Sequence, residues 1–428
     1  MLQAPRGTED ILPNEQVYWQ KIEKEFERIV SSLGFGKIAT PFFEYKSVFE
    51  RGVGAVTDVV EKQMFIVKRA GTFDELDTVE EELILRPEAT AGIARSYVEH
   101  GMQTWPQPVK LYYFGPMFRY ERPQKGRLRQ HYQFGLEILG TNNPFTDAFL
   151  IGLVKTIYQE IGLSNFIFEI NSIGCPNCRA KMKRAITNYY KPFKDLICSS
   201  CQNRLSKNPL RLLDCKQEKC QPFIANAPAL IDYLCPSCKE HFKNTLEYLE
   251  DLNIPYDFNP RLVRGLDYYT KTIFEVVPQD KSAALGGGGR YDNLIELFGG
   301  SPTGAIGFAG GVERTILEMK KQGIRLEPTP KPDMILIHLG DSAKKKSLSL
   351  LFQLQKEGFK VSLSLEKESL KSQLNAANKL KIPLALILGQ KETKEKTIIV
   401  RNMLDGAQET IPLKKLTNFL KAKLEVQS

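Results

Sequence analysis

The sequence has few histidines and no long apolar run. Its four histidines are His100, His131, His241 and His338. No two of them have the close spacing of a metal-binding pair, so we do not expect a histidine-based catalytic metal site. No stretch approaches the roughly 18 consecutive apolar residues of a membrane span, and the first residues lack the regions of a signal peptide. We therefore expect a cytoplasmic protein without a membrane partner.

Cysteine is absent before Cys175 and after Cys238. In a cytosolic protein, a cluster of cysteines indicates metal or redox chemistry before disulfides. Three pairs have the spacing of zinc knuckles and a fourth is looser: Cys175 and Cys178, Cys198 and Cys201, Cys235 and Cys238, and the looser Cys215 and Cys220. Because four thiolates complete one tetrahedral site, eight permit two. We predict structural Zn²⁺ here; simple reduced thiols are the alternative, and the spacing leaves the grouping open.

The sequence also lacks a P-loop. The segment Gly34-Phe-Gly-Lys-Ile has neither the spacing nor the Ser/Thr of this motif, and the run Gly286–Gly289 continues with Arg290-Tyr-Asp. A nucleotide, if bound, would therefore lie on a sheet. The glycine run could also be a plain flexible turn.

Length and charge indicate a soluble protein of two or three domains. The 428 residues carry a net charge of +9. Residues 331–428 hold 18 Lys and Arg against 10 Asp and Glu, whereas residues 1–330 hold 41 against 40. A basic terminal module on a near-neutral body fits a polyanionic partner. A solubilising lysine surface is the alternative.

Hydrophobic periodicity predicts the elements of the first 325 residues. We expect a helix over 14–33, an edge strand over 38–44, a hairpin of 109–121 with 129–140, and a helix over 141–163. The cysteine-bearing region of about 171–258 is mixed and helical, and it interrupts a sheet that resumes at Lys271. It is therefore interpreted as an insertion.

Three prolines in residues 326–332 mark a linker. After it, strands at 334–339, 361–365, 382–388 and 397–400 alternate with helices at 341–357 and 366–380. This alternation predicts a small α/β module with a partly parallel sheet.

The hairpin carries polar side chains of both signs. Strand alternation would place Arg119 and Glu121 on one face, and Gln133, Gly135 and Glu137 on one face of the partner strand. The intervening loop is cationic, with Arg122, Lys125, Arg127 and Arg129. Carboxylates beside a cationic loop suit a phosphate-bearing ligand held next to an amine. A solvated hairpin face is the alternative.

Six segments then resemble one known family. Leu262-Val-Arg-Gly-Leu-Asp-Tyr-Tyr-Thr270 resembles the histidine-specific signature of histidyl-tRNA synthetases, and Ala284-Leu-Gly-Gly-Gly-Gly-Arg-Tyr-Asp292 resembles their second specific motif. Phe118-Arg-Tyr-Glu121 and Gly307-Phe-Ala-Gly-Gly-Val-Glu-Arg314 resemble motifs 2 and 3 of class II aminoacyl-tRNA synthetases. Leu85-Arg-Pro-Glu-Ala-Thr-Ala-Gly92 resembles the segment that meets the amino acid's ammonium group. Thr40-Pro41 resembles part of the dimer-forming motif 1.

The resemblance implies roles for individual residues. Arg119 and Arg264 would be catalytic, as clamps on the α-phosphate. Histidine would be bound by Glu88, Thr90, Arg119, Gln133, Glu137, Arg264, Tyr268, Tyr269 and Tyr291. ATP would be bound by Arg119, Glu121 and Arg314, and the tRNA acceptor end by Gln124 and Arg129. A helix N-cap is the alternative for Thr90, and an ordinary helix start is the alternative for Glu313 and Arg314.

The resemblance also implies architecture and activity. We expect an α+β class II catalytic domain on a mostly antiparallel sheet over 1–325, with the insertion inside it, and an α/β anticodon-binding domain over 333–428. The protein would be a homodimer that activates L-histidine with ATP and Mg²⁺ and transfers it to tRNA(His). Independently of the resemblance, we expect the insertion to close over the acceptor stem, because it follows the motif 2 strands directly and carries basic runs such as Arg179-Ala-Lys-Met-Lys-Arg184.

Two other classes compete with this interpretation. A regulatory paralogue that partners an ATP phosphoribosyltransferase typically loses the signature arginine and the C-terminal domain, whereas this chain has Arg264 and the basic module. A synthetase for proline, threonine or glycine would share motifs 2 and 3, but it would not be expected to contain the histidine-specific signature at Leu262–Thr270.

Overall fold

The computed structural model describes residues 2–54, 57–68, 82–124, 126–326 and 332–425. The chain forms two compact units, which divide between Leu326 and Glu327. Most of the linker expected at 326–332 lies outside the described residues. Among the helices of the described ranges, none is both long and apolar enough to cross a membrane.

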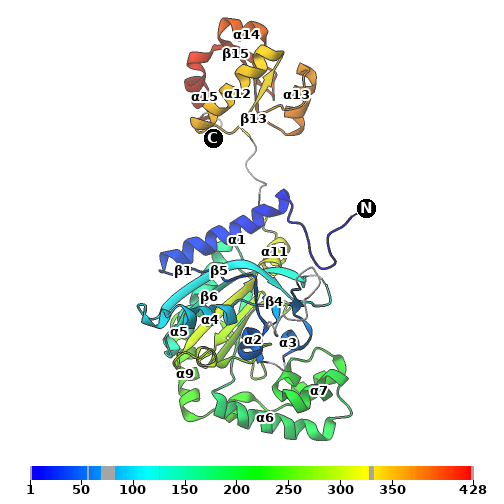
Figure 1. The fold of residues 1–428 in the computed structure, drawn as a ribbon, viewed down its shortest axis with the longest axis vertical. Coiled ribbons are helices and arrows are strands. Elements are labelled where there is room, and N and C mark those ends of the chain that lie inside the picture. Colours follow the sequence, from blue (N-terminus) through cyan, green and yellow to red (C-terminus); the bar gives the residue numbers. More distant parts are fainter. Residues whose placement is uncertain (1, 55–56, 69–81, 125, 327–331, 426–428) are drawn as a thin grey trace, which may run out of the picture. The chain divides into compact units, whose positions relative to one another are not determined.

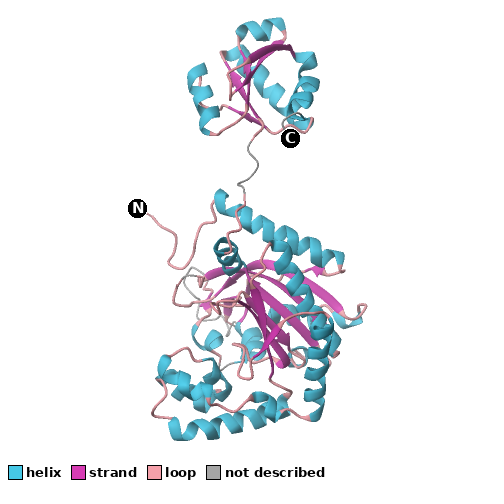
Figure 2. Ribbon diagram, turned by 180° about the vertical axis from the view of Figure 1, so that it is seen from behind, coloured by secondary structure: helices cyan, strands magenta, loops and turns pink. Residues whose placement is uncertain are grey.

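The first unit is built on a large twisted sheet, drawn in magenta in Figure 2. This sheet has eight strands in the order β1-β5-β6-β11-β10-β9-β7-β8. The central six strands are antiparallel, and the edge strands β1 and β8 run parallel to their neighbours. The expected mostly antiparallel sheet is confirmed. In sheet order the strands are Gly36–Lys37, Val109–Phe118, Gln130–Leu139, Ala305–Gly311, Gly286–Arg290, Thr270–Pro278, Phe166–Ser172 and Tyr256–Phe258.

Strand alternation gives this sheet one apolar face. On β6, Phe134, Leu136 and Ile138 are fully buried and pack into a core with four helices. These helices are α1 (Pro13–Ser32), α5 (Pro144–Ile161), α9 (Pro236–Asp251) and α11 (Val312–Lys321). The intervening residues of β6, among them Gln133 and Glu137, therefore point to the opposite face.

That opposite face is covered by shorter elements. A small sheet has the order β2-β4-β3, and helices and one π-helix pack near it. These elements are β2 (Phe43–Tyr45), β3 (Phe65–Ile66), β4 (Leu83–Leu85), α2 (Lys46–Phe49), η1 (Glu50–Gly54), α3 (Asp58–Lys62), α4 (Thr90–Glu99), η2 (Met102–Thr104) and α10 (Leu294–Leu297). The expected single strand over 38–44 is wrong: β1 ends at Lys37 and β2 begins at Phe43, because Pro41 between them cannot donate a ladder hydrogen bond.

The cysteine-bearing region forms short helices. Its helices α6 and α7 lie at the end of the first unit away from α1 (Figure 1). The elements are α6 (Pro176–Tyr190), η3 (Lys191–Phe193), α7 (Ser199–Lys207), η4 (Pro209–Asp214), η5 (Glu218–Cys220), α8 (Gln221–Ala225) and η6 (Leu230–Tyr233), followed by α9. The region returns to the main sheet through β8, which pairs with β7.

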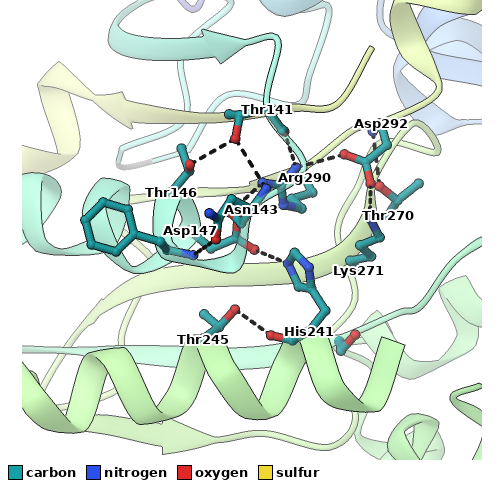
Figure 3. A network of polar contacts seen from close by, with 12 residues as sticks. Thr141, Asn143, Thr146, Asp147, His241, Thr245, Thr270, Lys271, Arg290 and Asp292 are labelled. Carbon is teal, nitrogen blue, oxygen red and sulfur yellow. Dashed lines mark hydrogen bonds and ion pairs between the residues drawn. The ribbon is translucent and has the colours of Figure 1, made fainter. Parts of the chain in front are cut away.

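A buried ionic network joins α5, β10 and α9 (Figure 3). Asp147 and Arg290 are both fully buried, and Arg290 Nε donates to Asp147 Oδ1 at 2.7 Å. The other Asp147 oxygen lies 2.8 Å from His241 Nε2. Arg290 also donates to the carbonyl of Thr141 and to Asp292. Asp147 and Arg290 therefore depend on these partners, because neither side chain is exposed to water.

Asp147→Ala is expected to lower the free energy of unfolding of the first unit by about 2–3 kcal/mol, because buried Arg290 Nε and His241 Nε2 lose their partner while Asp292 still pairs with Arg290. Urea denaturation followed by fluorescence measures the shift. Asp251→Asn, at the exposed end of α9, is the matched control and is expected to change stability by less than about 0.5 kcal/mol. Equal stability of the two variants would contradict the assignment.

The second unit is a small α/β module. Its sheet has the order β13-β12-β14-β15-β16, with the first three strands parallel and the last two antiparallel. The partly parallel sheet is confirmed, although β16, α14 and α15 were not expected. The elements are β12 (Met334–His338), α12 (Asp341–Lys356), β13 (Val361–Leu363), α13 (Leu370–Lys379), β14 (Leu384–Leu388), α14 (Gln390–Glu395), β15 (Thr397–Asn402), β16 (Gln408–Pro412), η7 (Leu413–Lys415) and α15 (Leu416–Glu425).

Candidate active site

A cavity of about 720 Å³ opens on the polar face of the main sheet. Its walls come from β6, β9, β10 and β11, from the loop before β9, and from the hairpin loop after β5. Ten of the residues that the resemblance assigns to histidine or ATP line it: Glu88, Thr90, Arg119, Glu121, Gln133, Arg264, Tyr268, Tyr269, Tyr291 and Arg314. Side chains from distant segments thus converge on one polar cavity.

Glu137 lies directly under this lining. Its carboxylate is buried and accepts hydrogen bonds from Thr90 Oγ1 at 2.7 Å and from the Tyr291 hydroxyl. Burial raises the pKa of Glu137 to about 8, although both hydrogen bonds act in the opposite direction. Gly307 on β11 pairs directly with Glu137 on β6, and a Cβ added to Gly307 would lie 1.9 Å from Glu137 Oε2. The glycine of motif 3 therefore makes room for the buried acid.

The raised pKa of Glu137 predicts a pH dependence of stability. Its folded value of about 8 exceeds the unfolded value of about 4.3, so its contribution is fully present below about pH 4 and is lost as pH rises through 8. Relative to wild type, Glu137→Gln should therefore become more stable between pH 5 and 8, by up to about 1.4 kcal/mol per pH unit. Urea unfolding of both proteins across this range measures the gap. A difference in unfolding free energy between the two proteins that does not change with pH would contradict the raised pKa of Glu137.

Glu88 caps α4 from inside the cavity. Its two carboxylate oxygens accept the N–H groups of Thr90 and Ala91 at 2.8 and 2.9 Å. Burial raises the pKa of Glu88, opposed by these backbone hydrogen bonds. The N-cap alternative for Thr90 is wrong, since Thr90 is the first residue of the helix and its hydroxyl donates to Glu137.

Three tyrosines form an aromatic wall. The ring centroids of Tyr268 and Tyr269 lie 4.7 Å apart, and those of Tyr268 and Tyr291 lie 5.7 Å apart. The Tyr268 hydroxyl reaches Glu88 at 3.5 Å. Burial raises the pKa of each phenol, so all three keep their protons at neutral pH. The wall combines flat apolar faces with hydroxyl donors, which suits a small aromatic heterocycle.

Arg264 projects over the glycine run of β10. Its guanidinium forms an ion pair with Glu275 on β9. Burial would lower the pKa of Arg264, but its interactions with Glu275 and Tyr269 outweigh burial and raise the pKa above its usual value. A Cβ on Gly287 would lie 2.6 Å from the Arg264 guanidinium. The flexible-turn alternative for the glycines is therefore wrong: they form a strand that leaves space for an arginine.

Arg119 and Glu121 follow β5 and are not part of it, so the expected strand alternation does not place them. The ladder stops at Phe118, and Arg119 Nε instead donates to the carbonyl of Pro87 at 2.8 Å. Glu121 lies 3.7 Å from Arg127 Nη1. Both residues still face the cavity. Lys125, in the same loop, lies outside the described residues.

Motif 3 brings another arginine to the hairpin loop. Arg314 Nε donates to the carbonyl of Gly126 at 3.1 Å, and its Nη1 donates to that of Ala284 at 2.8 Å. The neighbouring Glu313 accepts the N–H of Tyr132, and burial raises the pKa of Glu313 to about 7. Both residues stand in the first turn of α11, as the helix-start alternative expects, and their side chains also bond to segments outside that helix.

Gln124 and Arg129 do not line the cavity. The backbone of Gln124 pairs with Arg127 within the hairpin loop. The Arg129 guanidinium lies 3.9 Å from the centroid of the Tyr120 ring, and its Nη1 donates to the carbonyl of Arg6 at 3.4 Å.

Glu169, Glu275 and His131 are among the polar residues of the cavity that sequence reasoning missed. Glu169 and Glu275 face each other directly across β7 and β9. A single acid in the otherwise apolar run Thr272-Ile-Phe-Glu-Val-Val277 is a signal that could have found Glu275. Burial, then Arg119 and Arg314, lower the pKa of His131 to about 3, so its imidazole is neutral.

The eight cysteines are free and fall into two groups of four. We define the first group as Cys175, Cys178, Cys235 and Cys238, and the second as Cys198, Cys201, Cys215 and Cys220. Within each group all sulfur atoms lie within 4.8 Å of one another. Each group thus combines two cysteine pairs that are distant in the sequence.

Fold and cavity together define a class II aminoacyl-tRNA synthetase. A model of the histidyl-tRNA synthetase family matches residues 7–176 and 225–315, and a model of an anticodon binding domain matches residues 333–423. The chain belongs to the histidyl-tRNA synthetase family.

Individual relatives are similar over almost the whole chain. A histidine–tRNA ligase of Dehalococcoides mccartyi (strain ATCC BAA-2266 / KCTC 15142 / 195) is 46% identical over 99% of this chain and 100% of its own length. One of Desulforamulus reducens is 44% identical over 98% and 99%. The crystal structure of apo S. aureus histidyl-tRNA synthetase matches with a TM-score of 0.79 and 36% identity, over 98% of this chain and 99% of that one.

Proposed function

We propose that this chain is a histidine–tRNA ligase that converts L-histidine and ATP to histidyl-adenylate and pyrophosphate and then transfers histidine to the 3′ end of tRNA(His). The observation that carries this proposal is a single cavity in which Arg264 stands over a glycine strand beside a buried acid and three tyrosines. The same cavity thus offers an anion clamp and a pocket for an aromatic heterocycle.

The amino acid would lie between Glu88 and the tyrosines. We assign the imidazole to Glu137 and Tyr269, and the α-ammonium to Glu88, Thr90 and Gln133. Gln133 Oε1 is buried without a hydrogen-bond partner among the described residues, which makes it an available acceptor. Tyr268 and Tyr291 close the pocket.

ATP would lie along β10 and β11. We assign the α-phosphate to Arg119 and Arg264, the adenine amino group to Glu121, and the base face and terminal phosphate to Arg314. Carboxylate oxygens suit Mg²⁺, so Glu169 and Glu275 are the residues that would hold an ion accompanying the nucleotide. Bound Mg²⁺ would neutralise charge on the departing pyrophosphate.

The first step needs no protein base. A histidine carboxylate oxygen bonds to the α-phosphorus while the bond from phosphorus to the pyrophosphate oxygen breaks, and pyrophosphate takes that electron pair. The protein's task is to align the two anions and to offset their charge. Arg119 and Arg264, which both line the cavity, are the residues that we assign to this task.

The second step requires tRNA(His). We propose that residues 333–428 bind the anticodon, that residues 1–325 catalyse both steps, and that Gln124 and Arg129 meet the acceptor end. The cysteines would hold only structural Zn²⁺. The protein would act in the cytoplasm as a homodimer. Exposed apolar side chains on the small sheet, Phe43, Tyr45 and Ile66, support a partner surface there.

Amino-acid-dependent ATP–pyrophosphate exchange tests the proposal. Exchange with histidine alone among the twenty amino acids is the expected result. Bound histidine without any exchange would instead support a regulatory paralogue. Exchange with proline, threonine or glycine would overturn the assigned specificity.

A further inference from the structure

The sulfur atoms of both cysteine groups have the spacing of a tetrahedral four-thiolate site. Cys175 and Cys178 are 3.6 Å apart, Cys198 and Cys215 3.8 Å, and Cys201 and Cys220 4.0 Å, each measured between Sγ atoms. A tetrahedron with Zn–S bonds of about 2.3 Å has edges of about 3.8 Å. The geometry therefore fits one zinc ion in each group.

Backbone N–H groups point at these sulfur atoms. Cys235 N–H lies 3.1 Å from Cys178 Sγ in the first group. In the second, Cys198 N–H lies 3.3 Å from Cys220 Sγ, and Cys201 N–H lies 3.4 Å from Cys198 Sγ. Such donors offset thiolate charge and orient the ligands. These N–H groups support a metal-binding role for the sulfur atoms, because cysteines that are only buried in a core do not need such donors.

The first group borders the loop that carries Arg264. We define the signature loop as residues 262–269, which lie between β8 and β9 without helix or strand. Arg179, next to Cys178, donates through Nη1 to the carbonyls of Asp267 at 2.7 Å and Tyr269 at 3.2 Å. Gly174, next to Cys175, accepts the N–H of Lys271 at 2.8 Å.

The second group reaches the same loop through residues between its two cysteine pairs. Asn208 Nδ2 donates to both oxygens of Asp267, at 2.8 and 2.9 Å. Arg211 Nη1 donates to the carbonyl of Arg264 at 3.0 Å. Cys198 and Cys215 themselves line the cavity. The signature loop is therefore hydrogen-bonded to two segments of the insertion, and each of these segments carries cysteines of one group.

We propose that the insertion binds two zinc ions and that each zinc–thiolate group is a clamp that fixes the signature loop, so that Arg264 faces the cavity. The physical need is clear. In the region between β7 and β8 the cysteines are themselves part of the buried core, beside side chains such as Met182, Ile186 and Leu213, and small units of this kind gain stability from metal staples. The function of the clamp rests on the proposed ligase activity, whereas the metal sites do not.

Metal content of the purified full-length chain tests the sites. Wild type is expected to hold two zinc ions per chain. Cys178→Ser and Cys201→Ser are each expected to hold one, and the double variant none. Less than one zinc ion per wild-type chain, after expression with zinc, would overturn the sites. Loss of both ions in each single variant would overturn their independence.

Variants that keep all eight cysteines test the clamp. Asn208→Ala and Arg179→Ala are expected to retain two zinc ions but to lower the rate constant of histidine-dependent exchange at least tenfold, with histidine affinity changed less than threefold. The matched controls are Asn226→Ala in the same insertion and Arg184→Ala on the same helix, both exposed. Unchanged exchange in Asn208→Ala and Arg179→Ala would overturn the clamp. Absence of exchange in wild type would refute the ligase activity instead, and zinc content would still decide the sites.

Discussion

Arg264→Ala is expected to lower histidine-dependent ATP–pyrophosphate exchange by about 10²–10³-fold, because it removes one of the two guanidinium groups proposed to clamp the α-phosphate. Histidine affinity should fall far less, since Glu88, Glu137 and the tyrosines remain. The loss should therefore appear in the rate constant at saturating histidine. Exchange kinetics and isothermal calorimetry with histidine separate the two quantities.

The control for this variant is Arg28→Ala. Arg28 is an exposed arginine on α1 whose guanidinium also pairs with carboxylates, Glu25 and Glu160. Its loss should leave exchange within twofold of wild type. Equal loss of adenylate formation and of histidine binding in Arg264→Ala would refute a phosphate-clamping role.

Gly287→Ala is expected to lower exchange by about 10²-fold, although it adds one methyl group and removes no functional side chain. The new Cβ would lie 2.6 Å from the Arg264 guanidinium. This guanidinium ends a flexible side chain, so the fold can persist while the arginine is displaced from its position beside Glu275. Exchange kinetics, with urea unfolding to verify stability, measure both effects.

Gly36→Ala provides the matched control. Gly36 lies on the edge strand β1, and a Cβ there would meet its nearest neighbours at 3.9 Å. It should lose no activity. Wild-type exchange in Gly287→Ala would show that Arg264 does not need its present position, which would also weaken the role assigned to it.

Much of the fold could be predicted because local patterns dominate it. The alternation of apolar and polar residues along β6 separates Phe134, Leu136 and Ile138 from Gln133 and Glu137, and the structure places these sets on opposite faces. In the second unit, apolar runs separated by amphipathic helices predicted a partly parallel sheet. Both patterns depend on residues close in the sequence.

The remainder depends on tertiary pairing. Strand alternation could not place Arg119, because the ladder ends at Phe118 and the direction of Arg119 is set by the carbonyl of Pro87. Thr90 is a residue type that often caps a helix. Here Glu88 accepts the backbone N–H of Thr90 instead, and the Thr90 hydroxyl donates to Glu137.

The grouping of the cysteines was open for a similar reason. Spacing identifies pairs such as Cys175 with Cys178, but Cys235 joins them only through the course of the whole insertion. The roles assigned to individual cavity residues stay predictions until the variants above are measured.

The order of strands in the main sheet has a consequence for synthesis on the ribosome. β6 ends at Leu139, but its neighbour β11 begins only at Ala305. At a synthesis rate of about 5–20 residues per second, roughly 8–33 s pass between synthesis of the end of β6 and synthesis of the start of β11. Such non-local pairing slows folding and leaves an unpaired strand edge exposed to other chains. The active site, which spans β6 and β11, is therefore completed late, and aggregation of nascent chains competes with its assembly.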